Sequence, residues 1–241
     1  MFRGAMADNR YQLRDPSIQL VDDLIMRHID RNSRVIDLGC GDGRLMERLH
    51  REMGCHVVGI DVEQANIQAV IERGLPVVAS DLNQGLADIP SDSFDFAVLS
   101  QTLQQVQRPK QLLQEMLRVA DRGLVVVPNF GHWRVRWEVM LRGRTPITDA
   151  LPYEWHETPN VHFMSMRDFD ELMQSIGLRI VKQRPIIRGR AVEKAWAANL
   201  RADSAFYLLE RGQPLTSRSQ RPSGTARTAG SSAESAEPAG A

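Results

Sequence analysis

The 241-residue chain is 42% hydrophobic, enough for one globular domain with a sizeable core. Its 30 basic and 30 acidic side chains cancel, so no overall field favours a nucleic acid or a membrane surface as a partner. The two cysteines, Cys40 and Cys55, lack the spacing of a metal site, and no run approaches the ~20 apolar residues that span a bilayer. We therefore expect a cytoplasmic protein without a metal.

Composition divides the chain into three parts. Residues 1–14 are polar and predict a flexible N-terminus, whereas residues 212–241 have almost no large apolar side chains and predict a disordered tail. Residues 15–211 are expected to form one domain with an insertion at about 130–165. Helical spacing of apolar residues after Pro16 predicts a first helix that covers the sheet and the mouth of a ligand site.

A glycine-rich turn follows the first predicted strand, residues 35–38, and leads directly into a predicted helix. Its pattern is Asp37-x-Gly39-x-Gly41-x-Gly43. Because glycine has no Cβ, the backbone can turn tightly and a ligand can lie directly on it, while free N–H groups at the helix start can donate hydrogen bonds. The glycines are spaced by two throughout, unlike the G-x-G-x-x-G pattern that seats a pyrophosphate, so a nicotinamide-dependent dehydrogenase is a weak alternative.

This spacing resembles the first motif of class I S-adenosylmethionine (SAM)-dependent methyltransferases. The ligand of that class carries a sulfonium and an amino acid moiety instead of phosphates. The resemblance implies that SAM or S-adenosylhomocysteine binds at the turn, on Asp37 and the three glycines. It also implies a doubly wound, mostly parallel, seven-stranded α/β sheet with an antiparallel edge strand, in agreement with the repeated strand and helix pattern of the chain.

Asp61 follows the second predicted strand, residues 55–60. It stands 18 positions beyond Gly43 (61 minus 43), near the ~20-residue offset at which an acid meets ribose hydroxyls in nucleotide-binding α/β folds. A carboxylate there can accept from both hydroxyls, and Val62 is expected beside the same ligand. The alternative is that Asp61 only caps the next helix.

Asp81 and Leu82 follow the third predicted strand, residues 76–80. In the methyltransferase pattern an acid at this place meets the adenine amino group, and the backbone of the next residue touches the ring. The resemblance therefore implies that Asp81 and Leu82 bind the cofactor. The alternative is that Asp81 is a simple turn residue.

The fourth predicted strand, residues 94–99, leads to Ser100 and then to Gln104 and Gln105. Residues just past a central parallel strand line the crevice at the carboxyl edge of the sheet, so Ser100 is expected at the cofactor. The N-P-P-Y type motif of nucleobase amino methyltransferases is absent here, and glutamines stand where ubiquinone-type enzymes carry a histidine pair. Glutamine cannot act as a general base, so imidazole-assisted deprotonation at this position is excluded.

Three further strands are predicted, at residues 124–128, 179–182 and 205–210, and one of the last two is expected to be the antiparallel edge strand. The basic stretch 184–201 between them is expected to be a helix-bearing connection. Residues 130–144, which follow the first of these three strands, read as a helix whose apolar side chains recur at helical spacing with four arginines around them. It is either an ordinary amphipathic helix with a solvated basic face or an interface with a protein or an anionic substrate.

Residues 145–162 contain no periodic pattern but carry aromatic side chains and histidines, which is more typical of a functional loop than of a passive connection. His132, His156 and His162 are candidate bases. Each, taken alone, is better explained as a structural histidine.

Several runs together resemble the MetW family of bacterial methionine biosynthesis proteins over roughly residues 18–210. The resemblance implies a class I methyltransferase fold that works beside homoserine O-acyltransferase, of the acetyl or succinyl type, as a required partner. A methyl transfer of its own does not follow from the motifs. The runs that carry the resemblance are residues 37–43, 99–104, 128–136, 151–155 and 158–162.

Two functions therefore compete. As an enzyme, the chain would hold SAM and transfer its methyl group in line to a nucleophile, with His132 or Tyr153 as the candidate base. As a partner protein, it would keep the SAM site as a structural or sensing pocket, with residues 133–144 and 153–162 forming the interface with the acyltransferase. SAM is a downstream product of methionine synthesis, so its binding could report the status of the pathway.

Overall fold

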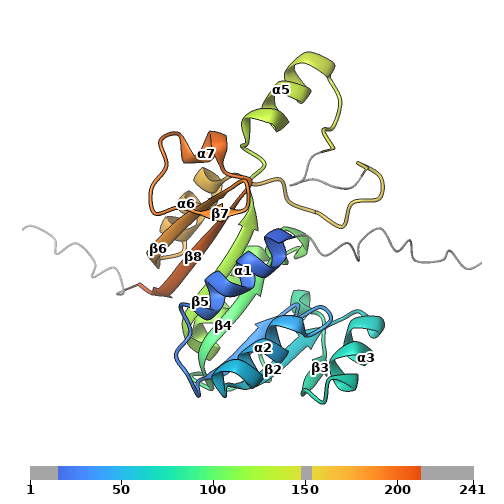
Figure 1. Cartoon of the computed structure of the whole chain (residues 1–241), viewed down its shortest axis with the longest axis vertical. Helices are drawn as coiled ribbons and strands as arrows, with labels where there is room; N and C mark the ends of the chain where they lie inside the picture. The colour runs from blue at the N-terminus through green and yellow to red at the C-terminus, as the bar shows by residue number, and fades with distance from the viewer. Residues whose placement is uncertain (1–15, 148–153, 213–241) are drawn as a thin grey trace, which may run out of the picture.

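The computed structural model describes residues 16–147 and 154–212 (Figure 1). The expected flexible N-terminus, almost all of the expected tail and Tyr153 lie outside the described residues. None of the described helices is long and apolar enough to cross a membrane, and no group of three or more potential metal ligands was found within these two ranges. Their helices are α1 (Pro16–Met26), α2 (Arg44–Met53), α3 (Gln64–Glu72), α4 (Pro109–Val119), α5 (Trp133–Arg142), α6 (Met166–Ser175) and α7 (Ala198–Arg201), with short 3-10 helices η2 (Leu82–Gln84) and η3 (Leu103–Gln105).

Eight strands of the described residues form one sheet in the order β3-β2-β1-β4-β5-β8-β6-β7. The first five strands in the chain pair parallel with one another, and β8 is antiparallel to both β5 and β6. This arrangement confirms the expected mostly parallel α/β class. The strands are β1 (Arg34–Leu38), β2 (His56–Asp61), β3 (Val77–Ala79), β4 (Phe94–Ser100), β5 (Ala120–Pro128), β6 (Leu178–Ile187), β7 (Arg190–Ala191) and β8 (Ser204–Arg211).

The second half of the sheet corrects three details of the prediction. The sheet has eight strands instead of seven, because the two-residue β7 pairs antiparallel with β6 at the edge. The long antiparallel strand β8 lies inside the sheet, between β5 and β6. Residues 184–187 belong to β6 and not to a helical connection, which is reduced to the one-turn helix α7.

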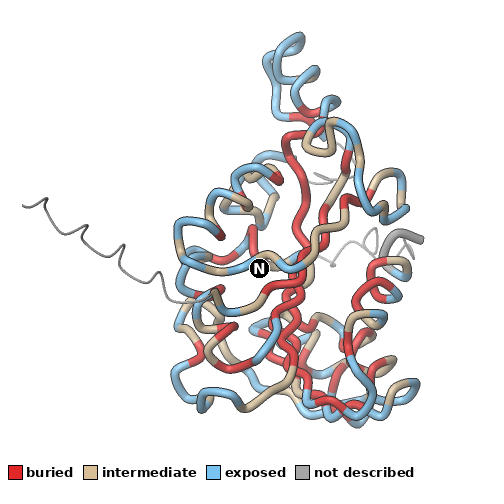
Figure 2. Tube along the Cα trace, turned by 90° about the vertical axis from the view of Figure 1, so that its left-hand side faces the viewer, coloured by how far each residue is buried: buried red, intermediate tan, exposed pale blue. Residues whose placement is uncertain are grey.

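Helices cover both faces of the sheet because alternate strand residues point to opposite sides. In β1, Val35 packs in a core that contains residues of α1 and α2, whereas Ile36 packs in a second core with residues of α4 and α6. Figure 1 shows α1 and α2 in front of the sheet, and Figure 2 shows buried residues concentrated along the strands. The first helix covers the sheet as expected, since Val21, Leu24 and Ile25 of α1 are buried in the same core as Val35. Its expected place over the mouth of a ligand site stays a prediction.

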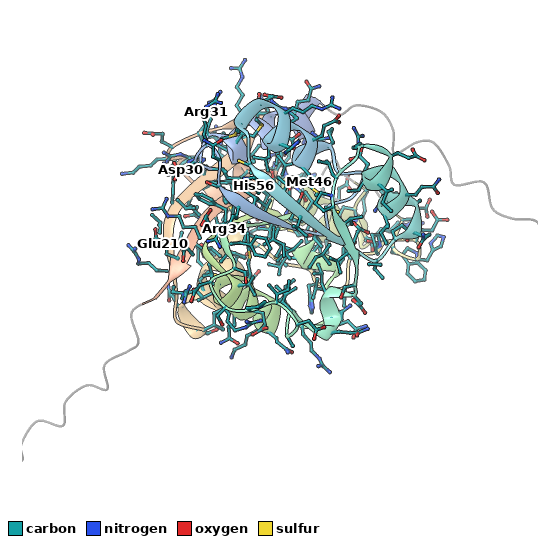
Figure 3. All side chains as sticks on the ribbon, turned by 90° about the horizontal axis from the view of Figure 1, so that it is seen from below. Asp30, Arg31, Arg34, Met46, His56 and Glu210 are labelled. Atoms are coloured by element: carbon teal, nitrogen blue, oxygen red, sulfur yellow. The ribbon has the colours of Figure 1, made fainter. Side chains whose placement is uncertain are left out.

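Parallel pairing brings the carboxyl ends of β1 to β4 to one edge of the sheet. Figure 3 looks at the opposite end, where Arg34 and His56 begin β1 and β2 and Glu210 lies near the end of the antiparallel β8. That end is tied by surface ion pairs such as Arg34 with Asp95. The turns that can hold a ligand therefore lie at the other end of the strands, where β1 to β4 have their carboxyl ends.

Asn129 joins three segments just beyond β5. It is fully buried, and its Oδ1 accepts from the N–H groups of Gly131 (3.1 Å) and Met166 (3.3 Å). Its Nδ2 donates to the carbonyls of Asn199 (3.0 Å) and Ala202 (2.8 Å). This side chain fixes the start of α6 and the α7 turn against the segment that leads into α5.

The substitution Asn129→Ala should lower the free energy of unfolding by at least about 3 kcal/mol, because it leaves three buried backbone groups and one partly buried carbonyl without this partner. Gln68→Ala removes an exposed amide from α3 and should change it by less than about 0.5 kcal/mol. Urea unfolding of both variants measures the difference. Equal stability of the two would contradict the role given to Asn129.

Candidate functional site

A cavity of about 450 Å³ opens at the carboxyl ends of β1, β2, β3 and β4, within the size range of small-molecule sites. Four turns contribute to it: the glycine turn, the entry to α3, the segment around η2 and the segment around η3. The lining residues are Gly39, Gly41, Asp61, Val62, Glu63, Asn66, Ser80, Asp81, Leu82, Asn83, Gln101, Thr102, Gln105 and Val106.

The glycine turn has the backbone that only glycine adopts readily. Gly39 and Gly41 have φ of +79° and +55°, in the left-handed region. A Cβ on Gly39 would lie 2.6 Å from the Thr102 side chain, whereas a Cβ on Gly41 would meet nothing within 4 Å. The space beside Gly41 therefore belongs to the cavity, and a ligand can approach the backbone there.

Gly43 has a different role. It is the N-cap residue of α2, and a Cβ on it would lie 2.8 Å from Val70 of α3. It does not line the cavity. The third glycine of the motif thus lets α2 and α3 pack closely behind the ligand site, and its expected cofactor contact remains a prediction.

Asp61 connects the two turns that flank the cavity. Its Oδ2 accepts from the N–H of Gly41 at 2.8 Å, and its Oδ1 accepts from the N–H of Glu63 at 2.9 Å and from Asn66 Nδ2 at 3.3 Å. Asp61 is 8% exposed and lines the cavity. The N-cap residue of α3 is Glu63, so simple helix capping does not describe Asp61.

Asp81 is a turn residue that also lines the cavity, and its expected contact with adenine remains a prediction. Its Oδ1 accepts from the N–H of Asn83 and from Asn83 Nδ2, both at 2.9 Å, and so caps η2. Asp81 and the following Leu82 also line the cavity. A carboxylate has two oxygens, so capping through Oδ1 leaves Oδ2 able to accept from a ligand.

The cavity is acidic. Asp61, Glu63 and Asp81 line it, and no lysine, arginine or histidine is found in its lining within residues 16–147 and 154–212. Such a site suits a ligand with hydroxyl groups and positive charge and disfavours one with phosphates. SAM has a ribose, a sulfonium and an amino group, so the donor and acceptor set fits SAM better than a dinucleotide.

Asp37 lies beneath the turn instead of lining the cavity. It is 3% exposed, and its Oδ1 has no hydrogen-bond partner within the described residues. Burial, together with the smaller effect of the nearby Asp61 carboxylate, raises the pKa of this carboxyl to about 7. Asp37 is thus a buried polar group that a cationic ligand above the turn would stabilise in its charged form.

The other expected residues lie elsewhere. Ser100 ends β4 and does not line the cavity. His132 does not line the cavity and is the N-cap residue of α5, where its Nδ1 accepts from the Arg134 N–H at 3.2 Å. Its Nε2 lies 3.6 Å from Asp203, so the ring has a structural role. His156 and His162 do not line the cavity either.

Some lining residues were not predicted as ligand contacts. Asn66 reaches the cavity because it lies on the first turn of α3, directly above Asp61, a placement that the acid's position and the predicted helix start could have indicated. Gln101 and Thr102 immediately follow the fourth strand, where a crevice was expected, but Gln101 has φ of +57°, which sequence alone does not reveal.

Asp37→Asn tests the buried carboxyl. The native carboxyl keeps its proton up to about pH 7, whereas in the unfolded chain it ionises near its ordinary pKa of 3.8. The native state therefore binds more protons than the unfolded state between about pH 4 and pH 7. In this window the contribution of Asp37 to the free energy of unfolding falls by roughly 1.4 kcal/mol for each pH unit, and above pH 7 it levels off. Urea unfolding at several pH values should show a smaller fall for Asp37→Asn than for the native chain. Identical pH profiles would contradict this assignment.

Comparisons with known proteins identify the family to which this chain is similar. The family model described as methionine biosynthesis protein MetW matches residues 21–209. A bifunctional methionine biosynthesis protein MetXA/MetW of Rhodopirellula baltica is 32% identical over 208 residues, which cover 82% of this chain and 33% of the relative. A ubiquinone biosynthesis O-methyltransferase of Maricaulis maris is 30% identical over 132 residues, covering 51% of this chain and 50% of the relative. The chain thus spans about a third and a half of the lengths of these two relatives.

Solved structures show the fold. SAM-dependent methyltransferases of Archaeoglobus fulgidus and Mesorhizobium loti superpose with TM-scores of 0.58 and 0.59 at 16% and 17% identity. The superpositions cover 80% and 78% of this chain, and 94% and 96% of those chains. The chain belongs to the MetW family of methionine biosynthesis proteins and has the fold of SAM-dependent methyltransferases.

Proposed function

We propose that this chain binds SAM or S-adenosylhomocysteine in the cavity and acts in methionine biosynthesis as a required partner of homoserine O-acyltransferase. The cytoplasm is the proposed location. The observation that carries the partner role is the Rhodopirellula baltica relative, whose name joins a MetXA part to a MetW part in one polypeptide. Parts that are fused in one protein commonly act together, because the linker holds them at high effective concentration.

Several residues support the cofactor. Asp61 would accept from the ribose hydroxyls and Asp81 from the adenine amino group, with Val62 and Leu82 beside the ligand. Gly39 and Gly41 would let the amino acid moiety lie on the backbone. Asp37 would act from below through its charge, and Gly43 and Ser100 through the packing of the turns. The three acids that line the cavity, Asp61, Glu63 and Asp81, have no basic residue beside them in the described lining, which suits the two positive charges of SAM.

The cavity also supports a partner role over independent chemistry. No histidine, lysine, cysteine or tyrosine is among the described residues that line it, and Gln105 is one of the lining residues. A nucleophile that must lose a proton would find no imidazole there. His132 caps a helix and Tyr153 lies outside the described residues, so neither gains support as a base.

An active methyltransferase that acts on a small molecule is the second candidate. The specific observation in its favour is the likeness to the Maricaulis maris ubiquinone biosynthesis O-methyltransferase, which spans half of this chain. An acceptor that is already deprotonated would need positioning alone.

Asp61→Asn should weaken S-adenosylhomocysteine binding about 10- to 100-fold, because hydrogen bonds to a charged acceptor contribute about 1.5–3 kcal/mol. Asp42→Asn is the matched control, since Asp42 lies in the same turn but its side chain is 54% exposed and pairs with Arg73. Titration calorimetry with each purified variant measures the two affinities. Binding that is equally strong in both variants would remove Asp61 from the ligand site.

The partner role predicts that homoserine O-acyltransferase is active only when this chain is present. The measurement is the rate of acyl transfer to homoserine with the acyltransferase alone, with the native chain added, and with SAM titrated into the mixture. Acetyl and succinyl donors are compared. An acyltransferase whose rate is indifferent to this chain with both donors would contradict the partner role.

A further inference from the structure

An apolar stripe runs along the exposed side of α5. Trp137, Met140 and Leu141 are spaced so that they share one face, and their exposed fractions are 54%, 69% and 60%. The helix stands away from the sheet at the top of Figure 1, and Figure 2 draws most of it as exposed. Contiguous apolar surface of this kind marks a place that another molecule covers.

The helix gains little stability from its own chain. It has ten residues, of which only Val135 is buried, against Phe130. Helices shorter than about 12–15 residues are marginal in water unless they pack on something. The His132 cap and the Phe130 contact fix the base of α5, and a partner surface along the stripe would supply the remaining packing.

The occupant that we assign to this stripe is the acyltransferase. In the Rhodopirellula baltica relative the MetXA and MetW parts belong to one polypeptide, and this chain matches a third of its length. Arg134 near the start of α5 and Arg144 just beyond its end are both exposed. The complementary surface on the acyltransferase is therefore apolar at its centre with acidic residues at its rim.

A second exposed segment lies next to the base of α5. Val161 and Phe163 are 59% and 65% exposed. The Phe163 ring stacks on Phe130 with centroids 4.7 Å apart, and the Phe130 N–H donates to the Met164 carbonyl at 3.0 Å. Residues 161–164 thus form one packed unit with the start of α5.

The same segment is bonded to the wall of the cavity. The N–H groups of Val161 and His162 both donate to the Gln104 carbonyl, at 2.9 and 3.0 Å. Gln104 is only 5% exposed and belongs to η3, between Thr102 and Gln105, which line the cavity. One peptide group therefore joins the ligand site to the exposed segment.

The turn that carries Gln104 is poised to respond to a ligand. Gln101 lines the cavity with φ of +57°, an uncommon conformation for a residue with a side chain. Its carbonyl accepts from Gln104 Nε2 at 2.7 Å and from the more exposed Gln105 Nε2 at 3.3 Å. A ligand that contacts Gln101 and Gln105 limits the conformations of this turn and, through Gln104, those of residues 161–163.

We propose that α5 and residues 161–163 form the docking surface for homoserine O-acyltransferase, and that a ligand in the cavity strengthens docking by fixing the Gln101–Val106 turn. This inference rests on the proposed function and names the surface and its regulation. By linkage, the acyltransferase then strengthens ligand binding by the same factor. Binding of a SAM-type ligand thereby promotes assembly of the complex between this chain and the acyltransferase.

The test uses the full-length chain, purified homoserine O-acyltransferase and S-adenosylhomocysteine, which has no methyl group to donate. Calorimetry measures the Kd for the acyltransferase with and without saturating S-adenosylhomocysteine, and the Kd for S-adenosylhomocysteine with and without the acyltransferase. We expect both dissociation constants to fall by the same factor, at least about fivefold.

Two variants and a control locate the surface. Trp137→Ala and Met140→Ala should each weaken docking at least about tenfold and leave S-adenosylhomocysteine affinity unchanged, because neither residue lines the cavity. Ile71→Ala, on α3, removes an aliphatic side chain that is 60% exposed and should change neither affinity. Equal losses in Met140→Ala and Ile71→Ala would overturn the docking surface.

Hydrogen exchange of the native chain tests the connection without any substitution. S-adenosylhomocysteine alone should slow exchange of the Val161 and His162 amides, since a fixed Gln104 carbonyl holds them more firmly. If the native chain binds no acyltransferase or no S-adenosylhomocysteine, the proposed function itself fails. If it binds both but each Kd is independent of the other ligand, the proposed function stands and the coupling is overturned.

Discussion

The Asp61 carboxylate is the interaction on which the ligand site depends. It accepts from Gly41 on one side and from Glu63 on the other, and so holds the glycine turn and the entry to α3 at a fixed separation. The N–H groups of Gly39 and Cys40 also donate to the Ile60 carbonyl, at 2.8 and 3.0 Å, so the backbone bonds the glycine turn to the end of β2. The parallel pairing of β1 with β2 brings the two turns together, and Asp61 sets the shape of the cavity between them.

The acids around this interaction give the site its chemical character. Asp61 and Asp81 line an open cavity, whereas Asp37 is buried beneath the turn, where burial raises its pKa to about 7. The acidic residues that line the cavity have no lysine, arginine or histidine beside them among the described lining residues. Such a site suits a cation with hydroxyl groups, and none of the described residues that line it carries an imidazole.

Much of the fold could be predicted because its signals are local. The glycine spacing, the buried strands and the acids after β2 and β3 are all visible within a few residues, and Asp61 and Asp81 do line the cavity. The position of β8 could not be predicted, because pairing between β5 and β8 joins residues about 80 positions apart. Likewise, residues 184–187 read as a charged connection, although pairing with β8 makes them strand.

The site was harder to predict where backbone geometry decides it. The left-handed conformation of Gln101 and the bonds from residues 161 and 162 to Gln104 have no sequence signature. Asp37 and Gly43 belong to the expected motif but do not line the cavity, because Asp37 is buried in β1 and Gly43 packs against Val70 of α3. A motif identifies the turn, whereas the packing of Val70 and Thr102 against Gly43 and Gly39 leaves open space only beside Gly41 among the three glycines.

The central claim is that this chain assists its partner without consuming SAM. The most direct measurement follows S-adenosylhomocysteine formation and acylated homoserine together, in one mixture of this chain, the acyltransferase, homoserine, acyl donor and SAM. The account predicts many turnovers of acylated product while SAM remains intact. Formation of S-adenosylhomocysteine in proportion to the acylated product would contradict it and identify the chain as a working methyltransferase.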